Sequence, residues 1–169
     1  MSIEEHKKTR MKNIKVMVVT ISDTRTFETD KSGRIMCELL SKNFFEITRY
    51  QIIKDELVDI KSTLNSGIED LNADVILTNG GTGISNRDVT YDVVDELIDK
   101  PIHGFGELFR MLSYEEIGSA SMLSRALAGT AKGTVIFSTP GSTGAVKLAM
   151  EKLILPELVH IVNELKKDN

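Results

Sequence analysis

Residues 14–21 carry the sequence IKVMVVTI, a nearly unbroken run of β-branched and other apolar side chains. A strand with one face in water alternates apolar and polar residues, whereas a strand covered on both faces is apolar throughout. Strands of the second kind occur mainly in parallel sheets, because helical crossovers then cover both faces. Residues 14–21 are therefore expected to form the first strand, in the middle of a mostly parallel sheet.

Strand and helix patterns alternate after this run. Apolar residues recur at helical spacing over 35–40 and again over 57–71, and each of these segments is followed by a strand-like apolar stretch, at 44–53 and at 74–78. Two parallel strands that follow one another in the chain need a crossover between them. The pattern therefore predicts an α/β fold of three layers, with a mostly parallel central sheet and helices on both faces.

The second half of the chain continues this pattern less regularly. Its expected elements, in chain order, are a helix near 93–98, a glycine turn at 103–106, a helix over 107–116 and a strand at 134–138. From Thr143 onward the chain is expected to be helical, and Pro156 is expected to begin a second helix because proline is tolerated in a first turn.

Length and composition narrow the class of protein. The 169 residues favour a single domain over 1–169, with short polar tails at about 1–12 and 166–169. The 21 Lys and Arg against 25 Asp and Glu give a net charge of −4, which argues against nucleic acid as a partner. One cysteine can form neither an intramolecular disulfide nor a multi-thiolate zinc site. Because the sequence has no signal-peptide pattern and no apolar run of roughly 20 residues, a cytoplasmic location without membrane contact is expected.

Two of the expected strands lead directly into glycine-rich loops, NGGTG at 79–83 and TPGSTG at 139–144. In open α/β sheets ligands bind at the carboxyl edge of the strands, where the free N–H groups of a loop and a helix start attract anions. A local phosphate site is therefore expected. The alternative is that Gly80, Gly81 and Gly83 only supply the backbone angles of a tight turn.

Common phosphate motifs do not match these loops. Neither loop contains the G-x-x-x-x-G-K-[ST] pattern of a P-loop. The spacing after Gly81 and Gly83 places Asn86 where a dinucleotide-binding fingerprint needs its third glycine. A P-loop ATPase and a dinucleotide-binding fold are therefore both disfavoured.

Two aspartates lie where the expected strands and loops end. Asp55 follows the stretch 44–53, and Asp88 follows the first glycine loop. Carboxylates at such positions suit Mg²⁺, which is usually held by one or two carboxylates together with substrate phosphates. Each aspartate also precedes an expected helix, where an Asp cap contributes about 1 kcal/mol, so from the residues alone both roles stay open. Asp23 is a weaker candidate of the same kind, and Arg125 is a candidate for neutralising phosphate.

A nucleophile of the protein's own is poorly supported. Cys37 lies among apolar positions of the first expected helix, where a buried and unreactive thiol is typical. No Ser-His-Asp or Cys-His arrangement suggests itself. This pattern suits a reaction in which the substrate brings its own nucleophile, because phosphoryl chemistry asks a protein mainly for positioning and charge stabilisation.

Six motifs identify a family resemblance: SDT at 22–24, KSG at 31–33, KDE at 54–56, TNGGTGISNRDVT at 78–90, GFGELFRMLSYEEIGSASMLSRA at 104–126 and PGST at 140–143. With them, the sequence resembles the molybdenum cofactor biosynthesis family that includes MogA, MoaB and the G domain of gephyrin, over residues 14–165. The GFGELFRMLSYEEIG stretch is most similar to the MoaB branch.

The resemblance implies that ATP and molybdopterin are the substrates and that Mg²⁺ is the cofactor. In that family the terminal phosphate of the pterin attacks the α-phosphorus of ATP, and pyrophosphate leaves. By motif, Asp55 and Asp88 correspond to the catalytic and metal-binding aspartates. The implied nucleotide-binding and pterin-binding residues are Ser22, Asp23, Gly80, Gly81, Thr82, Gly83, Arg125, Pro140, Gly141 and Ser142.

The family pattern also leaves alternatives. Its adenylylating members often have a second proline or an asparagine-rich turn after PG, where this chain has Ser142 and Thr143. Some relatives of the MoaB branch lack RDVT and are inactive, whereas this chain keeps RDVT at 87–90. A non-catalytic molybdopterin carrier of the same pathway is the alternative function. The related domain of molybdate-insertion enzymes is disfavoured, because the additional domains of those enzymes have no counterpart here.

The last expectation concerns the oligomeric state of the protein. The segments 108–117 and 153–162 carry more large apolar residues than one helix stripe normally hides, so another chain is expected to cover part of them. The alternative is burial within the monomer. The resemblance implies a homotrimer, or a hexamer of paired trimers as in the MoaB branch, with transient contacts to other proteins of cofactor biosynthesis.

Overall fold

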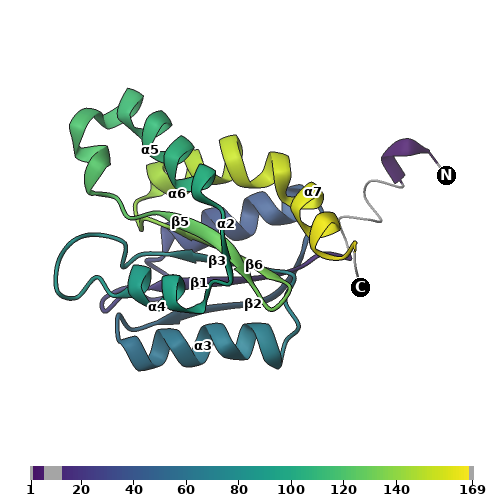
Figure 1. Ribbon diagram of the computed structural model, residues 1–169, viewed down its shortest axis with the longest axis horizontal. Helices are drawn as coiled ribbons and strands as arrows, with labels where there is room; N and C mark the ends of the chain where they lie inside the picture. The colour runs from purple at the N-terminus through teal and green to yellow at the C-terminus, as the bar shows by residue number, and fades with distance from the viewer. Residues whose placement is uncertain (1, 6–12, 168–169) are drawn as a thin grey trace.

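A computed structural model describes residues 2–5 and 13–167 of the chain (Figure 1). Strands and helices alternate along it, as the sequence predicts. Its elements are β1 (Lys15–Ile21), α2 (Lys31–Lys42), β2 (Glu46–Ile53), α3 (Leu57–Glu69), β3 (Val75–Asn79), α4 (Thr90–Leu97), β4 (Lys100–Pro101), α5 (His103–Ile117), the 3₁₀ helix η1 (Gly118–Leu123), β5 (Leu127–Ala131), β6 (Thr134–Thr139), α6 (Thr143–Ala149), the π-helical turn η2 (Met150–Ile154) and α7 (Leu155–Leu165).

Within residues 2–5 and 13–167, the sheet has six strands in the order β2-β1-β3-β6-β5-β4. The neighbours β2, β1, β3 and β6 are parallel, and β5 and β4 extend the sheet in antiparallel pairs. The mostly parallel sheet is therefore confirmed. Because the four parallel strands point the same way, the loops after them meet at one edge.

Helices cover both faces of this sheet (Figure 1). The helices α2, α5, α6 and α7 lie on one face, and α3 and α4 lie on the other. Successive side chains of β1 enter different apolar clusters, since Val16 and Val18 pack with the first group of helices, while Met17 and Val19 pack with the second. This explains why β1 is apolar throughout, and it confirms the three-layer α/β fold.

One predicted feature of the second half is wrong. The residues HGFG do not form a glycine turn, because α5 begins at His103 and they make its first turn. Gly106 serves close packing instead: a Cβ there would lie 2.8 Å from the carbonyl oxygen of Ala126, next to β5. Pro156 does stand in the first turn of α7, as predicted, and a π-helical turn joins α7 to α6.

Two further expectations concern the polar tails and membrane-spanning helices. Of the polar tails predicted at 1–12 and 166–169, residues 1, 6–12, 168 and 169 lie outside the described part of the chain. In the described part, no helix is both long and apolar enough to cross a membrane.

Candidate functional site

Three loops meet where β1, β3 and β6 end. The chain runs from β1 to β2 on one side and later to β3 on the other, so the crevice between β1 and β3 is the switch point at which open α/β sheets bind ligands. A cavity of about 480 Å³, called the site hollow below, opens there. It is lined by Ile21, Ser22, Thr24, Arg25, Gly80, Gly81, Thr82, Gly83, Asp88, Leu123, Ser124, Pro140 and Gly141.

The site hollow brings together most of the residues that the sequence singled out. Those that line it come from three loops and are Ser22, Gly80, Gly81, Thr82, Gly83, Asp88, Pro140 and Gly141. Asp23, Asp55, Arg125 and Ser142 do not line it. The motifs after three neighbouring strands thus form one surface, and the remaining four residues support it from outside.

Residues 80–83, the GGTG loop, need glycine for steric reasons. Gly80 and Gly81 have φ values of 101° and 70°, in the left-handed region that favours glycine. A Cβ on Gly80 would overlap the carbonyl oxygen of Ile21, and one on Gly81 would overlap the hydroxyl of Thr90. The loop therefore packs tightly against the end of β1 and the start of α4.

Neither Asp55 nor Asp88 caps a helix. The N-cap residues of α3 and α4 are Glu56 and Val89, and neither helix has a side-chain cap hydrogen bond. Asp88 accepts hydrogen bonds within its own loop instead, from the Ser85 N–H at 3.0 Å and the Ser85 hydroxyl at 2.6 Å. The capping alternative is wrong, because each helix begins one residue later than that role requires.

Both carboxylates lie against the GGTG loop. A Cβ on Gly81 would lie 3.1 Å from Oδ1 of Asp55, and a Cβ on Gly83 would lie 2.6 Å from Oδ2 of Asp88. Burial raises the pKa of Asp55, and the carboxylates of Asp88 and Asp23 raise that pKa further. Negative charge is therefore crowded beside this loop, which is the setting that a cation would relieve.

Three buried side-chain atoms of the described residues have no hydrogen-bond partner: Oδ1 of Asp55, Oγ1 of Thr90 and Oγ of Ser124. All three adjoin the site, since Asp55 and Thr90 lie against Gly81 and Ser124 lines the site hollow. Unpartnered buried polar atoms call for an explanation such as a bound ion or ligand. Residues 2–5 and 13–167 contain no group of three or more metal-ligating side chains, so a cation here would need oxygens from a ligand as well.

Asp23 and Arg125 hold the loops in place. Asp23 pairs with Arg87 at 2.8 Å and accepts the Asp55 N–H at 3.1 Å. The Arg87 guanidinium holds the pKa of Asp23 below its usual range. Arg125 donates to the carbonyl oxygens of Gly83 and Asp88, each at 2.9 Å. The site described above is thus braced by two arginines on its outer side.

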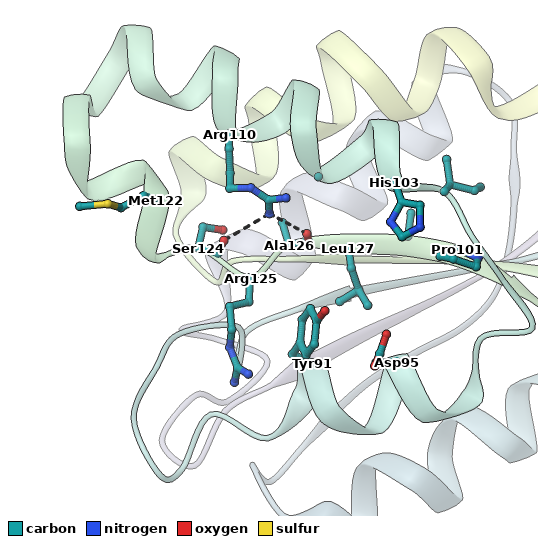
Figure 2. Close-up of a pocket in the computed structure, with 13 residues that line it drawn as sticks. Tyr91, Asp95, Pro101, His103, Arg110, Met122, Ser124, Arg125, Ala126 and Leu127 are labelled. Atoms are coloured by element: carbon teal, nitrogen blue, oxygen red, sulfur yellow. Dashed lines mark hydrogen bonds between the residues drawn. The ribbon is translucent and has the colours of Figure 1, made fainter.

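Arg125 faces a second cavity, of about 400 Å³, between α4, α5 and β5 (Figure 2). Its guanidinium lies 4.9 Å from the ring centre of Tyr91, and on the opposite wall Arg110 donates to the carbonyl oxygens of Ser124 and Ala126 (Figure 2). The structure therefore places Arg125 behind the GGTG loop, with donors already engaged by backbone oxygens.

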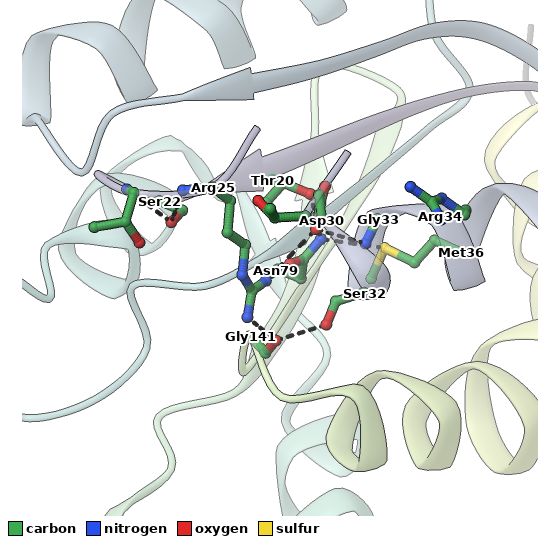
Figure 3. Close-up of polar contacts among 12 residues, drawn as sticks. Thr20, Ser22, Arg25, Asp30, Ser32, Gly33, Arg34, Met36, Asn79 and Gly141 are labelled. Carbon is green, nitrogen blue, oxygen red and sulfur yellow. Dashed lines mark hydrogen bonds and ion pairs between the residues drawn. The ribbon is translucent and has the colours of Figure 1, made fainter. Parts of the chain in front are cut away.

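The loop at 140–142, the PG loop, is held by side chains that the sequence did not single out. The carbonyl oxygen of Gly141 accepts from Nη2 of Arg25 at 2.8 Å and from the Ser32 hydroxyl at 2.7 Å (Figure 3). Ser142 accepts the Ala145 N–H at 3.3 Å, so it caps α6. Arg25 directly follows the SDT motif and Ser32 is the serine of the KSG motif, and these motifs were the only sequence signal for the two residues.

The thiol of Cys37 takes no part in this site. It is half-buried against the core formed with α2, and burial raises its pKa to about 11. A thiol with such a pKa is almost entirely protonated near neutral pH. The structure agrees with the interpretation of Cys37 as an unreactive packing residue.

Comparison with known proteins places the chain in a family. The family model described as "Probable molybdopterin binding domain" matches residues 17–160. The molybdenum cofactor biosynthesis protein B of Bacillus cereus is 56% identical over 168 residues, which cover 99% of this chain and 99% of that protein.

Solved structures agree. A crystal structure of a molybdenum cofactor biosynthesis protein B has a TM-score of 0.89 at 56% identity and covers 93% of this chain and 98% of that one. The tungsten cofactor synthesizing protein MoaB from Pyrococcus furiosus has a TM-score of 0.80 at 40% identity, covering 92% of this chain and 98% of that one. The resemblance seen in the motifs is confirmed: the chain belongs to the molybdenum cofactor biosynthesis family, and its role lies in the biosynthesis of that cofactor.

Proposed function

We propose that the protein transfers the adenylyl group of ATP to molybdopterin in a Mg²⁺-dependent reaction that releases pyrophosphate. The observation that carries this proposal is the placement of Asp55 and Asp88. These carboxylates come from different loops, face the same glycine loop, and include a buried oxygen without a partner. Carboxylates beside a glycine loop at the carboxyl edge of the sheet suit nucleotidyl transfer, which depends on compensating the charge of phosphates.

The reaction asks the chain for positioning and charge compensation. An oxygen of the pterin's terminal phosphate forms a bond to the α-phosphorus of ATP, and the bond from that phosphorus to the pyrophosphate oxygen breaks. The substrate supplies the nucleophile, so no serine or cysteine of the chain is needed. The GGTG loop offers backbone N–H groups to phosphate oxygens. Arg125 holds the end of this loop by donating a hydrogen bond to the carbonyl oxygen of Gly83.

Magnesium fits the donors that are present. Asp55 and Asp88 would hold it, because carboxylate oxygens are its preferred protein ligands and the phosphates complete its coordination. When bound, Mg²⁺ supplies positive charge against the phosphates. The hydrogen bonds from Ser85 keep the carboxylate of Asp88 in one orientation, beside Gly83.

Isosteric substitution of the two aspartates tests the proposal. With ATP, Mg²⁺ and molybdopterin, the wild-type protein should release pyrophosphate, and Asp55→Asn and Asp88→Asn should each lower the rate at least about hundredfold. Asp59→Asn is the matched control, since Asp59 is an exposed residue in the first turn of α3. Near wild-type rates in both site variants, with circular dichroism showing folded protein, would refute the assignment of these carboxylates.

Ligand binding separates an enzyme from a carrier. A ligand at 100 times its dissociation constant stabilises the native state by about 2.7 kcal/mol, which a thermal-shift assay detects. The proposal expects stabilisation by ATP with Mg²⁺ and by molybdopterin. Stabilisation by molybdopterin alone, without turnover, would establish the carrier function instead.

We also propose that the chain forms a closed homo-oligomer, a hexamer of paired trimers. Along α5 and η1 an exposed apolar stripe, the α5 stripe, consists of Leu108, Met111, Tyr114, Ile117, Met122 and Leu123. The run 153–162 contributes less than expected, because Ile154, Leu158 and Val162 are buried in the monomer's own core.

A charged substitution tests whether the α5 stripe is an interface between copies of the chain. Met111 is 54% exposed, so Met111→Asp should leave the fold intact and lower the molar mass measured by light scattering during size exclusion. Lys152→Asp, an exposed change on the π-helical turn, is the control. A wild-type protein that is a stable monomer at micromolar concentration would disprove the assembly.

A further inference from the structure

Among the described residues that line the site hollow, Arg25 is the one with a cationic side chain. Arg87 and Arg125, the other arginines described near this edge of the sheet, bind groups of the protein itself. Arg87 pairs with Asp23 and Glu56 on the outer side, and Arg125 binds the backbone oxygens of Gly83 and Asp88. An anion that enters the hollow therefore meets a single guanidinium.

The guanidinium of Arg25 is held by three segments of the chain (Figure 3). Nη2 donates to the carbonyl oxygen of Gly141 at 2.8 Å, and Nη1 lies 3.4 Å from Oδ1 of Asn79 and 3.6 Å from Oδ1 of Asp30. Asn79 is itself fixed by a hydrogen bond to the Thr20 hydroxyl at 2.9 Å. These contacts order the side chain before any ligand arrives, which lowers the entropy lost on binding.

The guanidinium also keeps donors available. Arginine has five N–H groups, and the three contacts use at most three of them. The side chain is 31% exposed, whereas that of Asp30 is fully buried. The Asp30 carboxylate is further engaged by the Gly33 N–H at 3.0 Å and by the Tyr50 hydroxyl. Its charge is thus satisfied on the buried side, and the cation stands between it and the hollow.

We propose that Arg25, which lines the site hollow, binds a phosphoryl group of the ligand there. This inference rests on the proposed adenylylation and names a residue of the same site. Guanidinium groups suit phosphate because two parallel N–H groups match two phosphate oxygens. The phosphoryl group belongs either to the nucleotide or to the pterin, and the binding experiment below distinguishes the two.

Variants must remove the cation without stranding the buried carboxylate. Arg25→Gln alone removes the counter-ion of the buried Asp30 carboxylate, and the loss of one partner of a buried ion pair destabilises proteins strongly. The double variant Arg25→Gln/Asp30→Asn removes both charges, and asparagine remains a good N-cap for α2. Asp30→Asn alone, which keeps Arg25, is the matched control. Thermal melts check that each variant is folded.

Calorimetry with ATP and with molybdopterin, and an NMR titration with uncharged adenosine, read out the role of Arg25. The double variant should bind ATP, molybdopterin or both at least about tenfold more weakly than Asp30→Asn, while adenosine affinity stays within about twofold. The ligand that weakens identifies the phosphate. Arg25→Lys should lose less affinity for the phosphate ligand, because lysine keeps the positive charge but lacks the planar guanidinium group.

Two results would overturn the inference. If the double variant loses affinity for adenosine as strongly as for ATP and molybdopterin, Arg25 has a purely structural role. If its affinity for ATP and molybdopterin is unchanged, Arg25 takes no part in binding them. Pyrophosphate release by the wild-type protein is measured in parallel. If that activity is present while the double variant binds normally, the inference about Arg25 fails and the proposed function stands; a wild-type protein that binds neither ATP nor molybdopterin overturns both.

Discussion

The GGTG loop and the PG loop occupy equivalent places after the neighbouring parallel strands β3 and β6, yet their surroundings are opposite. The GGTG loop lies against Asp55 and Asp88 and adjoins buried polar atoms without partners. In the PG loop the carbonyl oxygen of Gly141 accepts two hydrogen bonds, from Arg25 and Ser32. The lining of the site hollow thus holds a carboxylate, Asp88, beside one loop and a guanidinium, Arg25, beside the other, which suits a ligand that carries both phosphate and a metal ion.

The two loops also differ in how strictly they need glycine. Gly80 has a φ of 101°, and a Cβ there would overlap the carbonyl oxygen of Ile21. A Cβ on Gly141 would lie 3.3 Å from the Cα of Gly80, and its φ is outside the left-handed region. The backbone of the GGTG loop is therefore the more tightly constrained of the two.

Alanine substitution provides the sharpest test of this difference. Gly80→Ala should lower the free energy of unfolding by about 3 kcal/mol or more, because it adds a backbone clash to an unfavourable φ. Gly141→Ala should cost about 1 kcal/mol, since a few tenths of an ångström of movement relieve its contact. Urea titration of both variants measures the two losses. Equal losses would show that the loops are equally constrained and would end the comparison.

The carboxylates beside the GGTG loop should be recognisable by their pKa values. The pKa of Asp55 is raised above the ordinary value of 3.8, by burial first and by the charges of Asp88 and Asp23 next. In the metal-free protein, an NMR titration of the Asp55 carboxyl carbon should give a midpoint above 3.8, and Asp88→Asn should move that midpoint down. Asp23 is the internal control, because the Arg87 guanidinium lowers its pKa.

The raised pKa also sets the direction of the stability change. Asp55 ionises less readily in the folded protein than in the unfolded chain, so the contribution of Asp55 to the stability of the fold falls as pH rises from about 3.8 through the raised pKa. Mg²⁺ binding, which needs the ionised carboxylate, should weaken as pH falls through the same window. A midpoint at or below 3.8 in the wild-type protein would contradict a buried, crowded carboxylate at this position.

Local patterns predicted most of the fold for a simple reason. β1 is apolar at successive positions because helices cover both faces of the sheet, and that pattern survives in the sequence. HGFG was misjudged, because glycine serves turns and close helix packing alike, and only the proximity of Gly106 to Ala126 separates the two uses. β5 and β4 were not predicted as strands, since LAGTA and KP lack a strong apolar pattern.

The site, like the fold, has features that the sequence predicted and features that it could not predict. Glycine loops after strands are visible in a sequence, because backbone angles and close approaches restrict the residue type at single positions. Whether Asp88 caps α4 or faces a ligand depends on where that helix begins, and a difference of one residue decides it. Such boundaries follow from packing across the whole molecule, and neighbouring residues alone do not specify them.

The sequence by itself determined the order of strands and helices, the glycine loops and the family, because each depends on residues close together in the chain. Only the tertiary structure decided which charges line the site hollow. Arg25 reaches Gly141 across 116 positions of sequence, and Asp23 reaches Arg87 across 64. Parallel strands bring such distant loops to one edge of the sheet, and no local pattern records which side chains then meet there.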